Sequence, residues 1–326
     1  MNLKESILKT IGFFDVFDFP LTAEEMLMYL YKYDKPIHIK EVKGVLGDLA
    51  QNGLVEFIKD HYVLPGRGKI IDTRRARKFL SEKLWDRVRF YADSMRAIPF
   101  IRMIAVCNNL AYNNASEGSD IDLLVIVKPG RMWIARLLLT MMLWFYGVRR
   151  HGNHIAGRFC LSFFITTNKL HFEHLQLGPE DPYLAYWTMT LNPFYGKKTY
   201  EEFREANKAW LKETYGLNIP ESVGEQLVEL PERRIKVFNE WVFGGWFGKL
   251  IEGLLKRTLK KKTLASKQKL GPEASVVVDD DMLKFHNRDR RAEYREAWMK
   301  RSVYSDAGTV AGTGAETVDD KGAAGA

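Results

Sequence analysis

The feature that most restricts the possible folds of this chain is a very apolar segment, Asp120 to Val127, that opens with the sequence Asp-Ile-Asp. A second compact apolar run, Met103 to Cys107, precedes it, and the residues between the two runs, 108–119, are polar. Short apolar runs bounded by polar turns are typical of buried strands. The sequence therefore predicts a strand, a polar turn and a second strand.

Asp120 and Asp122 stand at the head of the second predicted strand. Side chains alternate along a strand, so the two carboxylates project from one face, about 7 Å apart at a rise of ~3.3 Å per residue. Two such carboxylates repel unless a cation lies between them, and a hard divalent ion such as Mg²⁺ takes carboxylate oxygens together with substrate phosphates. We expect both residues to be metal ligands and catalytic groups; the alternative is a strand-end pair that caps a turn or faces solvent.

The stretch from Ile101 to Val127 resembles the nucleotidyltransferase superfamily, which includes DNA polymerase beta, the kanamycin nucleotidyltransferases and the minimal nucleotidyltransferases of prokaryotes. The family pattern is an apolar strand, Gly-Gly or Gly-Ser, a short spacer and then Asp-x-Asp. In this chain Asn108-Asn109 stands at the Gly-Ser place, and Asp120-Ile121-Asp122 closes the pattern after the ten residues 110–119. The resemblance is specific over these residues and extends less specifically to about Tyr200.

The resemblance implies an α+β fold with a mixed sheet flanked by helices. It also implies a two-metal transfer of a nucleoside monophosphate from a nucleoside triphosphate (NTP) to an unknown acceptor. Asp120 and Asp122 would hold the Mg²⁺ or Mn²⁺ ions that bridge the triphosphate. Asn108, Asn109 and Ser119 would lie near the triphosphate.

Two positions depart from the family pattern. Asn108-Asn109 is bulkier than Gly-Ser, although Asn is the non-glycine residue that best tolerates left-handed geometry and its amide can donate to phosphate. The third carboxylate that family members supply from a later strand is missing from Arg158 to Thr166, where Ser162 stands at the expected place. We predict Glu173 as its substitute. The alternative is a catalytically decayed protein of this fold that binds nucleic acid or a protein.

The whole chain divides into five predicted segments. Apolar residues at helical spacing, followed by two short strand-like runs, give the first segment the winged-helix order. The segments are a winged-helix-like module (1–66), a basic connecting helix (67–96), a nucleotidyltransferase-like domain (97–218), a C-terminal helical region (219–302) and a disordered tail (303–326). Within the third segment, Asp181 to Tyr195 is expected to form one helix.

Winged-helix modules often bind DNA by placing their third helix in the major groove. The third predicted helix of this chain has only Lys40 and Lys43 as cations, and two acidic residues offset them. The phosphate-neutralising contribution to DNA affinity would therefore be small. We expect this module to pack against protein, and nucleic acid is the alternative partner.

Positive charge is concentrated in two stretches. Lys and Arg number 49 against 41 Asp and Glu, and the balance is 11 against 4 in Arg67 to Arg102 and 8 against 1 in Lys249 to Lys269. The second stretch overlaps a segment rich in Trp and Phe, 231–259. Aromatic residues beside a basic run are typical of membrane interfaces and of surfaces that bind nucleic acid or proteins. Because glycines interrupt this segment, we expect its aromatics to pack on the transferase-like domain and its lysines to be solvated.

Cys107 and Cys160 lie in apolar runs without the paired spacing of a disulfide framework or a zinc site, so reduced, buried thiols are expected. The N-terminal residues lack the cleavage pattern of a signal peptide. The longest uncharged apolar run, Leu137 to Val148, has 12 residues, whereas a spanning helix needs ~20. We expect a cytoplasmic protein without a transmembrane segment.

Overall fold

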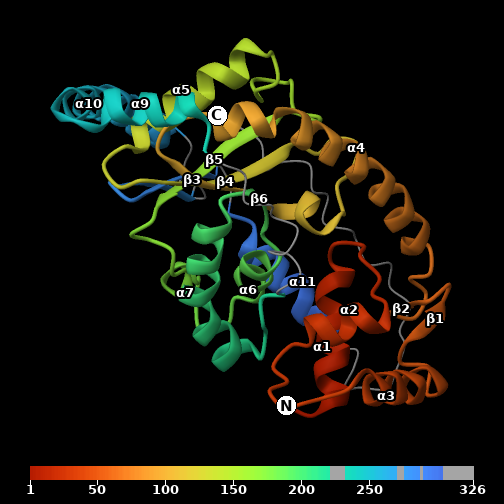
Figure 1. Ribbon diagram of the computed structural model, residues 1–326. Helices are drawn as coiled ribbons and strands as arrows, with labels where there is room; N and C mark the ends of the chain where they lie inside the picture. The colour runs from red at the N-terminus through yellow and green to blue at the C-terminus, as the bar shows by residue number, and fades with distance from the viewer. Residues whose placement is uncertain (221–231, 270–274, 287–288, 304–326) are drawn as a thin grey trace.

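The computed structural model describes residues 1–220, 232–269, 275–286 and 289–303. Its centre is a six-stranded sheet of order β6-β3-β4-β5-β8-β7 (Figure 1). The strands are β3 (Ile101–Val106), β4 (Ile121–Val127), β5 (Phe159–Thr166), β6 (Asn192–Tyr195), β7 (Ser275–Val278) and β8 (Met282–His286). β4 and β5 are parallel and joined by the crossover helix α5 (Met132–Phe145), and the other pairs are antiparallel. The predicted α+β class with a mixed sheet is confirmed.

The first part of the chain has the predicted order of three helices and a hairpin. The elements are α1 (Leu3–Asp15), α2 (Ala23–Tyr29), α3 (Ile39–Gln51), β1 (Glu56–Ile58) and β2 (His61–Val63). At the start of α2, the Thr22 hydroxyl accepts from the N–H of Glu25, and the Glu25 carboxylate accepts from the N–H of Thr22, which is a capping box. The 27-residue helix α4 (Ile70–Arg96) then connects this part to the sheet.

Strand β4 is buried on both faces, which explains its continuous apolar sequence. Leu123 and Val125 pack in the hydrophobic cluster that contains α5. Leu124 and Ile126 pack in the opposite cluster, which contains residues of α1, α6 (Pro182–Met189) and α7 (Lys197–Tyr215). The hydrophobic core of the first three helices is therefore continuous with the core on one face of the sheet.

Two segments differ from their predicted structure. The segment Asp181 to Tyr195 is not one helix: α6 ends at Met189, and residues 192–195 form the edge strand β6. Pro193 cannot continue a helix and is tolerated on an edge strand. The predicted C-terminal helical region contains α9 (Arg234–Gly244), α10 (Trp246–Lys269) and α11 (Arg291–Val303), and it also contains the hairpin β7-β8, which extends the sheet beside β5. Residues 304–326 of the predicted tail lie outside the described residues.

The expected packing of the aromatics in 231–259 is wrong for three residues near the α9-α10 break. Phe238 is 59% exposed, Trp241 is 78% exposed and Trp246 is 77% exposed, whereas Phe243 packs against the cluster around α5. The reason is that other side chains of α9 and α10 face the sheet. Within the ranges given above, no helix is both long enough and apolar enough to cross a membrane.

Candidate functional site

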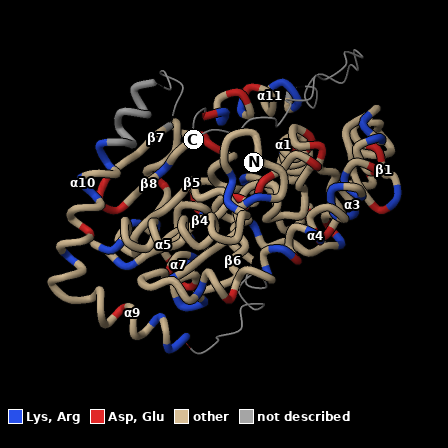
Figure 2. Tube along the Cα trace, turned by 90° about the horizontal axis from the view of Figure 1, so that it is seen from above, with Lys and Arg blue, Asp and Glu red and all other residues tan. Residues whose placement is uncertain are grey.

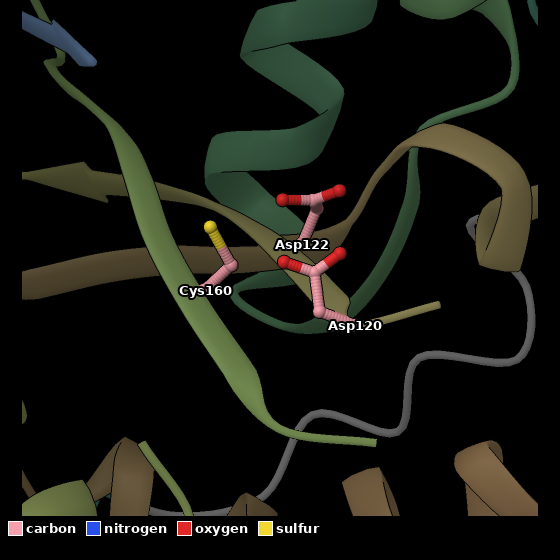
Figure 3. Close-up of side chains that lie close together, drawn as sticks. All are labelled: Asp120, Asp122 and Cys160. Atoms are coloured by element: carbon pink, nitrogen blue, oxygen red, sulfur yellow. The ribbon is translucent and has the colours of Figure 1, made fainter. Parts of the chain in front are cut away.

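The two predicted carboxylates lie at the start of β4, where this strand pairs with the end of β3. The N–H of Cys107 donates to the carbonyl of Asp122 at 3.0 Å, which extends the β3-β4 ladder past its last strand residue. On the other side of β4, Asp122 is opposite Cys160 of β5 in the parallel register. Ligand atoms of Asp120, Asp122 and Cys160 all lie within 4.8 Å of one another (Figure 3). The structure therefore brings the predicted pair together and adds a thiol.

Burial and mutual repulsion define the electrostatics of this cluster. Burial, and then the neighbouring charge of Asp122, raise the pKa of Asp120 to about 7. The Arg150 guanidinium opposes this shift, because its Nη1 lies 2.5 Å from Oδ2 of Asp120. Burial, followed by the charges of Asp122 and Asp120, raises the pKa of the Cys160 thiol well above its ordinary value. A bound cation would offset the repulsion between these carboxylates.

The metal-free protein is expected to lose stability as the pH rises from about 4 to about 8, because Asp120 holds its proton more tightly when folded than when unfolded. Its folded pKa of about 7 exceeds the unfolded value of about 3.9. The stabilisation is thus complete below pH ~4 and is lost as the pH rises through ~7. This loss of unfolding free energy is on the order of 2 to 4 kcal/mol. Urea unfolding in EDTA across this pH range measures the loss.

Asp120→Asn should flatten that pH dependence, since the amide does not titrate. Asp86→Asn, which changes an exposed carboxylate of α4 that is paired with Arg89, is the matched control and should leave the slope as in the wild type. An unchanged slope in Asp120→Asn would show that other groups cause it.

Asn108 orients Asp122. Its φ of 57° is the left-handed backbone conformation, in which Asn is among the few tolerated non-glycine residues. Its Oδ1 accepts from the indole N–H of Trp187 at 2.7 Å, and its Nδ2 donates to Oδ2 of Asp122 at 2.6 Å. An indole nitrogen only donates, so the amide is held in one orientation. Both ends of this side chain are used within the protein.

Of the other predicted site residues, Asn109 and Ser119 lie in the same turn, and Glu173 lies away from it. Asn109 begins the turn beside Asn108, and its Oδ1 accepts from the Tyr112 hydroxyl at 2.7 Å. The Ser119 hydroxyl accepts from the N–H of Ser116 at 2.9 Å, so it closes a turn. Glu173 does not join the Asp120 cluster: it lies in the short helix Glu173–Leu175, half-exposed, 3.1 Å from Nε2 of His171.

A small pocket lies behind the Asn108-Asn109 turn. Its volume is about 30 Å³, and aromatic side chains of α1 and α6 line it together with both asparagines. A volume of this size holds about two waters, and a nucleotide does not fit. The contact that connects α6 to the turn is the hydrogen bond from Trp187 to Asn108.

Arg150 and Cys160 are site residues that the sequence analysis did not predict. Cys160 lies two positions before Ser162, so the alternation of side chains places the two on one face of β5. This alternation is the sequence signal that could identify Cys160. Arg150 lies in the loop between α5 and β5, where its N–H donates to the carbonyl of Phe159. Both cysteines are free thiols, as predicted, although Cys160 is only partly buried.

The donor set fits one divalent ion. Two carboxylates supply the oxygens that Mg²⁺ and Mn²⁺ prefer, and substrate phosphates and waters would complete their coordination. The thiol of Cys160 is a soft donor that suits Zn²⁺, Co²⁺ or Cd²⁺ better than Mg²⁺. Among the described residues, this is the one group of three potential ligands that the structure gathers.

No family model, curated protein or solved structure matches this chain in the comparisons. The expected resemblance to nucleotidyltransferases therefore depends on the sequence of residues 101–127.

Proposed function

We propose that the protein is a metal-dependent nucleotidyltransferase, which transfers a nucleoside monophosphate from an NTP to an acceptor. The observation that carries this proposal is the pair of largely buried carboxylates at the head of a central strand, with a pKa of about 7 for Asp120. A pair of this kind is arranged for a divalent cation and its phosphate ligand.

The reaction is a substitution at the α-phosphorus of the NTP. An acceptor hydroxyl oxygen bonds to the α-phosphorus, the bond to the bridging oxygen of the β-phosphate breaks, pyrophosphate leaves, and the hydroxyl proton passes to solvent. A bound divalent ion supplies charge neutralisation to the phosphates. Asp120 and Asp122 would hold it, and Asn108 would keep Asp122 in its binding orientation. When a metal ion replaces the Arg150 guanidinium as the partner of Asp120, this guanidinium would place a positive charge beside the phosphates.

A second candidate function is that of a catalytically decayed binding protein. Three observations favour it: Arg150 already neutralises Asp120, Asn108 already donates to Asp122, and β5 places the thiol of Cys160, not a third carboxylate, opposite Asp122. DNA is not favoured as its ligand, because Lys43 of α3 pairs with Glu24 at 2.9 Å and is partly neutralised.

Equilibrium binding of each common NTP, labelled at the α-phosphate, tests the proposal. Measurements in Mg²⁺, Mn²⁺ and EDTA should give binding that requires the metal. Transfer of the label to a candidate acceptor then supports the enzyme, and metal-dependent binding without transfer supports the decayed protein. Absence of nucleotide binding under every metal condition would refute the transferase and leave the decayed protein that binds nucleic acid or a protein.

Cys160→Asp is expected to raise the affinity for Mg²⁺ by roughly tenfold or more. The new carboxylate would lie opposite Asp122 in the β4-β5 register. One additional unit charge ~4 Å from the ion contributes several kcal/mol even at an effective dielectric constant of about 20, of which ion dehydration and carboxylate repulsion cancel a part. Isothermal titration of the metal-free protein with Mg²⁺ measures the effect.

Cys160→Ser is the matched control, because it removes the thiol without adding charge. It should leave the Mg²⁺ affinity within about twofold and weaken the binding of Cd²⁺, which prefers thiolate. Equal Mg²⁺ affinities of Cys160→Asp and the wild type would place the ion away from β5.

A further inference from the structure

Helices α9 and α10 form an outer layer at one edge of the molecule (Figures 1 and 2). Their inner sides are connected to the domain by two carboxylates, of which Glu240 is partly buried and Glu252 is buried. Glu240 of α9 accepts from Arg102 at 2.8 and 3.0 Å and from the N–H of Phe100 at 2.7 Å. Glu252 of α10 accepts from the first N–H groups of α5, those of Trp133 and Ile134, at 2.9 Å each. The placement of both helices is thus specified by polar contacts on one side.

Their outer sides are apolar. Trp246, Leu250 and Leu254 follow one another at i, i+4 and i+8 on α10, so they form one stripe. These three residues are 77%, 53% and 56% exposed, and Phe238 and Trp241 of α9 are 59% and 78% exposed. The rings of Phe238 and Trp241 are in contact, with centroids 6.2 Å apart. We call these five residues the aromatic face. Clustered exposure of large apolar side chains marks an interaction surface.

Positive charge continues the stripe along α10. Arg257 and Lys261 follow Leu254 by three and seven residues and are exposed, and Lys249 is exposed near the start of the helix. The acid of this segment, Glu252, is 8% exposed because it points toward α5. The solvent side of α10 therefore combines an apolar half and a basic half.

We propose that the aromatic face and the basic half of α10 bind the surface of an anionic membrane. Trp prefers the interface between headgroups and acyl chains, aliphatic side chains enter the acyl region, and Lys and Arg bind anionic headgroups. Leu250 and Leu254 favour lipid over single-stranded nucleic acid, because aliphatic side chains do not stack on bases. A second copy docked by a two-fold axis would bring two equally basic helices together. This inference does not depend on the nucleotide chemistry.

Sedimentation with vesicles tests this inference on the full-length protein. The wild type should sediment with vesicles of phosphatidylcholine containing about a third phosphatidylglycerol and much less with phosphatidylcholine alone, and tryptophan emission should shift to the blue. Trp241→Ser combined with Trp246→Ser should weaken binding to the anionic vesicles by at least about tenfold, since each buried Trp contributes more than this factor. Arg257→Glu with Lys261→Glu should remove the preference for anionic vesicles.

Phe79→Ser provides the control: it removes an aromatic, 58% exposed, from the basic helix α4, and it should leave vesicle binding unchanged. Far-ultraviolet circular dichroism verifies that each variant is folded. Four results would overturn the proposal. Three of them are absence of sedimentation, a double tryptophan variant that sediments like the wild type, and binding of an oligonucleotide without binding of vesicles. The fourth is a concentration-dependent dimer that the tryptophan substitutions abolish, which would identify a second copy as the occupant.

Discussion

Asp122→Asn is expected to reduce nucleotidyl transfer by at least about a thousandfold, which corresponds to about 4 kcal/mol of transition-state stabilisation. The side chain is 7% exposed, and the amide has the same shape as the carboxylate. Its oxygen can still accept from Nδ2 of Asn108, which lies 2.6 Å from Oδ2 in the wild type. What the substitution removes is the negative charge that would hold the divalent ion. Initial rates of label transfer at saturating NTP, in Mg²⁺ and in Mn²⁺, measure the loss.

Folding and metal binding can be separated in this variant. The repulsion between Asp120 and Asp122 disappears, so the metal-free variant should be at least as stable as the wild type in EDTA. Glu173→Gln is the matched carboxylate-to-amide control, because Glu173 is half-exposed and pairs with His171; its transfer rate should equal that of the wild type. Full transfer by Asp122→Asn would refute the proposed site, and loss of transfer in Glu173→Gln would identify Glu173 as the third acid.

The central part of the fold could be predicted from sequence because its signals are local. Apolar runs and turns define β3 and β4, and Thr22 with Glu25 marks the start of α2. The sequence does not predict strands β6, β7 and β8, because short strands at or next to the edge of a sheet depend on neighbours that are far away in the sequence. β8 pairs with β5 across more than a hundred residues, as in the register of Phe163 with Lys284. The periodicity of a short sequence segment does not indicate a pairing between residues so far apart.

The residues of the candidate site likewise divide into those that local sequence predicts and those that depend on distant neighbours. The common orientation of Asp120 and Asp122 follows from the alternation of side chains along one strand, and the sequence suffices for it. Cys160 reaches Asp122 only through the register of the parallel pair β4-β5, which tertiary packing determines. Arg150 reaches Asp120 from the loop before β5. The prediction of Glu173 follows from its chemical type alone, and the fold places this residue in the short helix Glu173–Leu175, outside the Asp120 cluster.

Asp15→Asn is expected to destabilise the whole fold by about 3 kcal/mol, since removing one member of a buried ion pair leaves its partner charge uncompensated. Asp15, at the end of α1, is 2% exposed, and its two carboxylate oxygens accept from Nε of Arg67 at 2.8 Å and from Nε of Arg301 at 2.7 Å. Arg67 also pairs with Asp18 at 2.6 Å, so it keeps a partner. Arg301 of α11, with its side chain 9% exposed, loses its carboxylate. The urea midpoint of unfolding measures the effect.

The same substitution distinguishes a specific ion pair between α1 and α11 from general surface electrostatics. Asp72→Asn is the matched control, because this carboxylate is 70% exposed and lies 3.5 Å from Lys59 and 3.8 Å from Arg75; it should cost less than about 1 kcal/mol. In Asp15→Asn, α11 should also become the first helix to lose protection from hydrogen exchange, since α1 retains its apolar contacts with α6. Equal urea midpoints of the two variants would show that the buried pair contributes no more than a surface pair.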